Sequence, residues 1–197
     1  MRLAFIPSAP LLLPALGGGP EELRSACHQA ISVLGDDIVV LGGASPTGWR
    51  TGTVDATPWG APGVAAADPL PLPLAVGSAL LGDRPHRLLA VDGTAVVLPP
   101  DSSVLVVGDG TARRTDKAPG HYDPRAEPLD TQFAEALRDG RPEGLLVDEV
   151  LAAELLVAGA AVWRTVAATV AEPVSAELLY AAAPFGVGYV VATWIGS

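Results

Sequence analysis

Two short, uninterrupted apolar runs constrain the fold more than any other feature of this sequence. Ile38–Leu41 and Val104–Val107 each contain only aliphatic residues, and each ends at once in glycine, at Gly42 and Gly108. A strand that is apolar on both faces must be covered on both sides, which is typical of the inner strands of an α/β sheet. We therefore predict two buried strands, each opening at its carboxyl end into a loop.

Helical patterns alternate with these runs. Apolar residues at helical spacing predict a first helix that follows Pro20 and a second helix over residues 72–81. The others are a helix that ends near Gly140, one capped by Asp148 and one around Trp163. The inward faces would carry Leu23, Cys27, Ala30, Ile31 and Leu34 in the first helix, Leu129, Phe133 and Leu137 in the third, Leu151, Leu155 and Ala158 in the fourth, and Trp163, Val166 and Val170 in the last. Cys27 is then a small core residue and not a nucleophile.

Further strands are expected at both ends of the chain and in its middle. These are residues 2–6, a hairpin of 88–91 and 94–98 around Asp92-Gly93, and closing strands near 178–182 and 187–194. Alternating strands and helices predict a single α/β domain over residues 1–197, a layered sandwich with a central mixed β-sheet flanked by helices.

Composition excludes several classes of function. Twenty-two acidic residues against 12 basic ones argue against nucleic-acid binding, which depends on Lys and Arg neutralising phosphates. Every apolar stretch is broken before the roughly 20 residues that a spanning helix needs, so no membrane segment is expected. The lone Cys27 excludes an internal disulfide and a cysteine-rich zinc site, and we expect a cytoplasmic protein.

Residues that could carry chemistry are few. His28, His86 and His121 are the three histidines, and no two have a spacing typical of metal ligands. The sequence contains neither a Gly-x-Ser-x-Gly nucleophile motif nor a Gly-Lys-Ser/Thr phosphate loop. We therefore name no catalytic residue, no metal ligand and no cofactor.

The segment 108–125 is the densest polar stretch. It holds four of the 12 basic residues, among them Lys117, the only lysine, and it follows a predicted buried strand. Open α/β sheets place ligands at the carboxyl ends of their strands, so this segment is a candidate binding loop. The alternative is a solvated surface loop held by its own Arg–Asp pairs.

Motifs spread along most of the chain point to a known family. They are Ile6–Pro10 with Leu11–Pro14, Gly108–Arg113, Ala118–Gly120, Asp123–Arg125, Glu127–Asp130, Ala158–Arg164 and Pro184–Tyr189. In these segments the chain resembles the class III extradiol dioxygenases of the protocatechuate dioxygenase catalytic-subunit type and their Memo-like relatives. The resemblance implies that family's α/β fold, an iron site held by two histidines and a carboxylate, and the family's habit of pairing subunits.

The chain departs from that family at the positions where chemistry occurs. The resemblance places the first histidine ligand on Ser8, the second near Gly43 or Ala44, the carboxylate ligand on Ala160, and the acid–base histidine on Ala112. A further family histidine falls near Asp68-Pro69. Alanine and glycine side chains cannot coordinate iron, and serine is a poor ligand for it. We therefore expect that the chain is not a working metalloenzyme.

Three functions stay open at this point. The preferred one is a metal-free member of the fold that binds a small anion or acts as an interaction module. An enzyme with a relocated site, built from His121 with Asp109 and Asp123, is the second. A structural partner subunit or homo-oligomer is the third. For the preferred function we expect Arg113, Arg114 and Lys117 at the rim of a pocket, oriented by Asp109 and Thr111, and the full candidate set is Ser8, Asp109, Thr111, Arg113, Arg114, Lys117 and His121.

Overall fold

The fold is built on one mixed sheet that takes strands from both ends of the chain. The structure, a computed structural model, describes residues 1–17, 19–99, 101–171, 173 and 175–196. Seven strands pair in the order β3-β4-β2-β5-β1-β7-β6. They are β1 (Arg2–Ile6), β2 (Ile38–Gly43), β3 (Gly48–Arg50), β4 (His86–Val91), β5 (Ser103–Val107), β6 (Ser175–Ala182) and β7 (Tyr189–Ile195).

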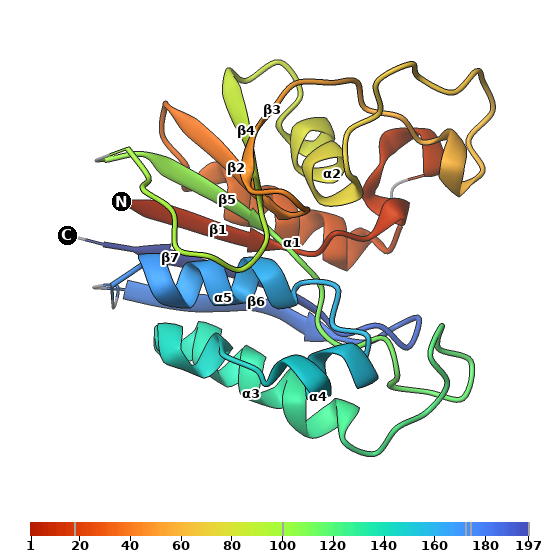
Figure 1. The fold of residues 1–197 in the computed structure, drawn as a ribbon, viewed down its shortest axis with the longest axis vertical. Helices are drawn as coiled ribbons and strands as arrows, with labels where there is room; N and C mark the ends of the chain where they lie inside the picture. Colours follow the sequence, from red (N-terminus) through yellow and green to blue (C-terminus); the bar gives the residue numbers. More distant parts are fainter. Residues whose placement is uncertain (18, 100, 172, 174, 197) are drawn as a thin grey trace.

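The four inner strands β4, β2, β5 and β1 run parallel, and β3, β7 and β6 extend the sheet antiparallel at its two sides. Every residue of β5 is buried, as its unbroken apolar sequence predicts. Arg2 pairs with Ile195, so the first and last strands of the chain lie side by side at the centre of the molecule (Figure 1).

Helices cover both faces of the sheet (Figure 1). Helices α1 (Glu21–Ser32) and α2 (Leu72–Leu81) pack on one face with Ile6, Val40 and Val107. Helices α3 (Ala126–Asp139), α4 (Glu149–Glu154) and α5 (Ala160–Thr169) pack on the other with Phe5, Leu41 and Val106. The predicted layered α/β sandwich with a central mixed sheet is therefore the fold of this chain. Short 3₁₀ turns at Pro10–Leu12, Pro14–Leu16, Thr57–Trp59 and Pro142–Leu145 complete it.

Several local predictions are confirmed in detail. The Asp148 carboxylate accepts hydrogen bonds from the amides of Val150 and Leu151, which caps α4 as expected. Gly140 ends α3 in the left-handed conformation. Cys27 is fully buried among the apolar side chains of α1, and burial raises the pKa of its thiol to about 12. The thiol is therefore a core group and not a nucleophile.

The predicted hairpin of 88–91 and 94–98 is wrong in its second half. Residues 88–91 lie in β4, but both edges of β4 are already paired, with β2 and with β3. Asp92 Oδ1 accepts hydrogen bonds from the amide and the hydroxyl of Thr94, which turns the chain away from the sheet. The next residues lie along α5, where the Thr165 hydroxyl donates a hydrogen bond to Thr94 O.

The inward position predicted for Ala158 is also wrong. Helix α4 ends at Glu154, so Ala158 belongs to the turn that precedes α5 and is exposed. In the part of the chain that the structure describes, no helix has the length and apolar character needed to cross a membrane.

Candidate functional site

The crevice between the carboxyl ends of β1 and β5 is where this topology offers a site. After β1 the chain leaves toward α1 on one face, whereas after β5 it leaves toward α3 on the other. Neighbouring strands whose connections leave to opposite faces open a crevice, and open α/β sheets bind ligands there. Ser8 follows β1 and Asp109 follows β5, so the fold brings these two predicted site residues together.

Ser8 and Asp109 bind each other at this position. The Ser8 amide donates to Asp109 Oδ1 at 2.7 Å, and the Ser8 hydroxyl donates to Asp109 Oδ2 at 2.7 Å. The Asp109 backbone oxygen accepts from the Gly159 amide at 3.0 Å and from Trp163 Nε1 at 3.1 Å. Both carboxylate oxygens therefore have partners inside the protein, and the turn before α5 is bonded to the backbone of the same residue.

Burial dominates the electrostatics of Asp109. Only 7% of the residue is exposed. Desolvation raises the pKa of its carboxyl to about 6, against the opposing effect of the two hydrogen bonds from Ser8. Burial and, next in size, the nearby Asp109 carboxylate also raise the pKa of Tyr189 to about 12. Burial thus destabilises the ionised form of Asp109 in the folded protein.

Thr111 and Arg114 belong to a second buried carboxylate, that of Asp130 on α3. Asp130 accepts the Thr111 amide at 2.8 Å, the Thr111 hydroxyl at 2.9 Å and Arg114 Nη1 at 3.1 Å. Arg114 also pairs with Glu127 at 3.1 Å. Side chains at Gly110 and Gly188 would collide with Asp130, since an added Cβ would lie 2.3 Å from its oxygens. The expectation that Thr111 orients the cations toward a ligand is therefore wrong, because its hydroxyl and its amide both donate to Asp130.

The remainder of the segment 108–125 is folded against α4. Ala112 N donates to Leu155 O at 3.0 Å, and Arg113 Nη1 donates to Glu154 O at 2.9 Å. Arg125 binds Asp123 through two nitrogens and Glu154 through a third. The alternative of a surface loop held by its own Arg–Asp pairs is therefore correct for Arg125 and Asp123. Asp109 orients neither Arg113 nor Arg114, because its carboxylate is bound to Ser8.

The relocated site of His121, Asp109 and Asp123 does not form. His121 is exposed and its Nδ1 lies 3.3 Å from Asp116 O, whereas Asp109 is buried against Ser8 and Asp123 is bound to Arg125. Across the described residues, no group of three or more His, Cys, Asp or Glu side chains is placed to hold a metal ion. The structure therefore does not bring together the three residues from which the relocated site was expected to be built.

Three of the four positions that the resemblance assigns to metal chemistry meet at one edge of the sheet. An added Cβ at Gly43 would lie 3.6 Å from Ala161 Cβ and 3.7 Å from Ala158 O. The same turn carries Ala160, and its Gly159 amide binds Asp109, the partner of Ser8. At this edge the side chains at positions 43 and 160 offer no ligand atom, and the Ser8 hydroxyl donates to Asp109.

The three cations that were expected at the rim of one pocket lie in different places. Arg114 lies at a small cavity of about 150 Å³ between α3 and the β6–β7 strands. Lys117 lines a surface cavity of about 570 Å³ together with Thr115, Asp116, Pro184 and Phe185. Arg113 extends toward α4 instead. Of the predicted cations, Lys117 is the one beside a cavity large enough for a small organic ligand.

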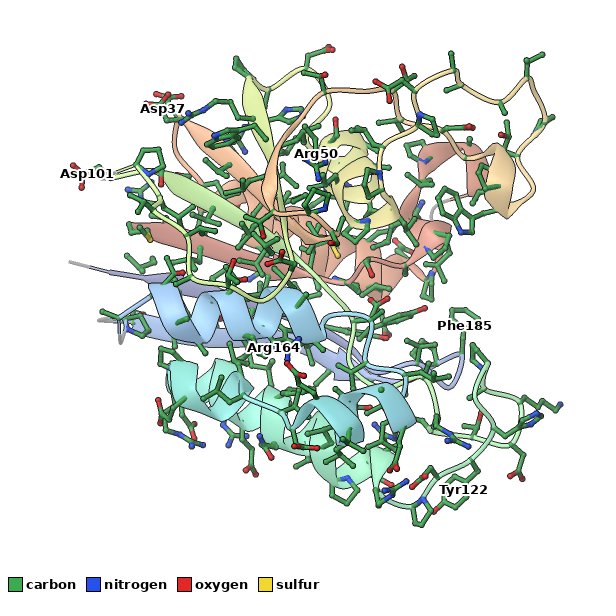
Figure 2. The ribbon with its side chains drawn as sticks, in the orientation of Figure 1. Asp37, Arg50, Asp101, Tyr122, Arg164 and Phe185 are labelled. Atoms are coloured by element: carbon green, nitrogen blue, oxygen red, sulfur yellow. The ribbon has the colours of Figure 1, made fainter. Side chains whose placement is uncertain are left out.

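Of the cavity residues only Lys117 is in the predicted site, and Phe185 is the large apolar residue among those that were not predicted. It stands on the turn between β6 and β7, near the end of the molecule that also carries Tyr122 (Figure 2). The turn lies against the segment 108–125 because Arg114 N donates to Gly186 O at 3.0 Å. Phe185 is 51% exposed, and a large apolar residue in a turn between two strands is the sequence signal that could have identified it.

A scan against protein-family models gives no match, and a search of curated proteins gives no significant match.

Proposed function

We propose that this chain is a metal-free binding protein for a small carboxylate with an aromatic body. The observation that carries the proposal is that Lys117 and Phe185 line the same cavity of about 570 Å³. An ammonium group can bind the carboxylate, and the exposed ring can cover an apolar body that would otherwise face water.

The metal-free part of the proposal follows from the side chains at the sheet edge. Ser8 is bound to Asp109 through its amide and its hydroxyl, and the chain has glycine and alanine at positions 43, 112 and 160. The likeness to class III extradiol dioxygenases supports a binding role at this end of the sheet without the iron chemistry of that family. A cytoplasmic location belongs to the same proposal, since the one thiol, Cys27, is buried in the core.

Charge explains why this cavity suits an anion. Among the described residues Lys117 makes no ion pair, whereas Arg114, the other predicted cation that lines a cavity, pairs with Glu127 and Asp130. Six other arginines in the same part of the chain also make no ion pair, namely Arg2, Arg24, Arg50, Arg84, Arg87 and Arg113. In a chain of net charge −10, a cation without an internal carboxylate partner is a local site for a ligand carboxylate. Asp116 lines the same cavity and opposes that attraction.

Benzoate binding tests the proposal. We expect the Lys117→Ala and Phe185→Ala variants each to weaken benzoate binding by about fivefold or more, because one removes the counter-charge and the other the apolar wall. Isothermal titration or chemical-shift titration measures this directly. Arg141→Ala, which removes an exposed cation outside the cavity, is the matched control and should bind like the parent. Equal affinity in the parent and both cavity variants would contradict the proposal.

Asp116 supplies a test with the opposite sign. Asp116→Asn removes a negative charge from the cavity lining and should strengthen benzoate binding by about two- to fivefold at low salt. The gain should shrink as salt is added, since the side chain is exposed. A loss of benzoate affinity in this variant would contradict the charge argument, because removing a negative charge from the lining cannot weaken the binding of an anion through electrostatics.

A further inference from the structure

Two β-turns meet at the cavity of about 570 Å³ that contains Lys117 and Phe185. The charged turn, residues 115–118, is closed by a backbone hydrogen bond of 3.0 Å between its end residues, and the apolar turn, residues 183–186, by one of 3.1 Å. The two middle residues of each turn line the cavity, and these are Asp116 and Lys117 in the first and Pro184 and Phe185 in the second. The cavity is therefore lined by the tips of two separate turns.

Backbone contacts hold the two turns against each other. Arg114 N, just before the charged turn, donates to Gly186 O at 3.0 Å. A Cβ added at Gly186 would lie 2.5 Å from Ala118 Cβ and 2.7 Å from Thr115 Oγ1, and the φ of 76° at Gly186 disfavours a side chain as well. The amide of His121 donates to Ala118 O at 2.9 Å and braces the charged turn at its far end. The backbone thus fixes both walls of the cavity before a ligand arrives.

The charged turn carries two opposite charges that do not neutralise each other. Asp116 and Lys117 are consecutive and exposed, yet neither forms an ion pair in the part of the chain that the structure describes. The hydrogen bond across the turn fixes the backbone of both residues, so the two side chains leave the tip from different points. A carboxylate and an ammonium group are therefore both available at the cavity, beside the half-exposed ring of Phe185.

We propose that the ligand of this cavity is a zwitterionic α-amino acid whose side chain is apolar and aromatic. The ligand carboxylate binds the Lys117 ammonium, the ligand α-ammonium binds the Asp116 carboxylate, and the ligand ring covers Phe185. A simple anion is attracted by Lys117 and repelled by Asp116, whereas a zwitterion is attracted by both residues. This inference rests on the carboxylate site proposed above and adds a second charge to its ligand.

L-Phenylalanine and 3-phenylpropionate are the probes, because they differ only in the α-ammonium group. At low salt we expect the parent to bind L-phenylalanine about threefold more tightly, as measured by isothermal or chemical-shift titration. Asp116→Asn should weaken L-phenylalanine binding by about threefold and strengthen 3-phenylpropionate binding by about twofold, which reverses the preference. Asp83→Asn removes one exposed acid outside the cavity and should leave the preference unchanged.

The results separate this inference from the function proposed above. A parent that binds L-phenylalanine no more tightly than 3-phenylpropionate, or a preference that Asp116→Asn leaves unchanged, would overturn the zwitterion and leave the carboxylate site standing. Lys117→Ala should weaken the binding of both probes, and a variant that weakens neither would overturn the carboxylate site and this inference with it. Asparagine is itself a turn-forming residue, so the unfolding midpoint of Asp116→Asn should stay that of the parent.

Discussion

Replacing Asp130 with alanine should lower the free energy of unfolding by about 3 kcal/mol, because it breaks a buried ion pair from one side. Thr111 would lose the acceptors of its amide and its hydroxyl, and Arg114 would keep only the exposed Glu127. Thr111 is fully buried, so water cannot replace the lost acceptors without a local opening. Urea unfolding at pH 7, followed by circular dichroism, measures the change.

Asp139 on the same helix gives the matched control. Its side chain is 42% exposed and pairs with Arg138 and Arg141 at the surface. Asp139→Ala should therefore change the free energy of unfolding by less than about 0.5 kcal/mol. The loss of stability in Asp130→Asn should lie between those of Asp130→Ala and Asp139→Ala. The asparagine amide oxygen can still accept from Thr111 N, whereas its amide nitrogen faces another donor, Arg114. Similar stabilities for Asp130→Ala and Asp139→Ala would contradict the role given to Asp130.

Asp109→Asn should stabilise the protein at pH 7, by an amount that depends on pH. The folded-state pKa of about 6 lies above the ordinary aspartate value of 3.8, so the folded chain binds this proton more tightly than the unfolded chain does. Ionising Asp109 therefore removes stability as pH rises from about 4 to about 6, and a shift of this size corresponds to at most about 3 kcal/mol. Asparagine has no such charge, and its amide can still accept from Ser8 N and donate to Ser8 Oγ.

Unfolding measured at several pH values tests whether Asp109→Asn stabilises the protein. The stability of Asp109→Asn minus that of the parent should be smallest at pH 4 and should grow up to about pH 6 and then level off. Asp123→Asn is the control. Its hydrogen bonds with Arg125 lower the pKa of Asp123 to about 2, so its contribution is lost only below the ordinary aspartate range and its difference curve should be flat from pH 4 to 7. A difference for Asp109→Asn that shrinks with rising pH would contradict the buried-acid account.

The sequence predicted the elements whose signal is local. The inner strands follow from continuous aliphatic runs, as in β5, and the α4 start follows from the capping residue Asp148. The hairpin after Asp92-Gly93 was wrong because a turn signal does not say whether the edge of the strand is free, and β4 has neighbours on both sides. Edge occupancy depends on the pairing of distant segments, which no local pattern contains.

The candidate site was predictable in position but not in its bonding. Ser8 and Asp109 could be placed at adjacent strand ends, yet the sequence could not show that they bind each other. The position of Asp130 is itself a sequence signal, since an acid between Ala126 and Phe133 on the apolar face of α3 must have buried partners. The Lys117–Phe185 cavity joins turns that are about 70 residues apart in the chain, so only the folded structure brings them together.

The metal content of the purified protein tests the central claim most directly. The chain should be incubated with Fe(II), Zn(II) or Mn(II), dialysed against metal-free buffer and measured by elemental analysis. With Ser8 bound to Asp109 and alanine at positions 112 and 160, we expect far less than one metal ion per chain and no O₂ consumption with protocatechuate or other catechols. Close to one metal ion per chain, retained through dialysis, would contradict the account of a metal-free binding protein.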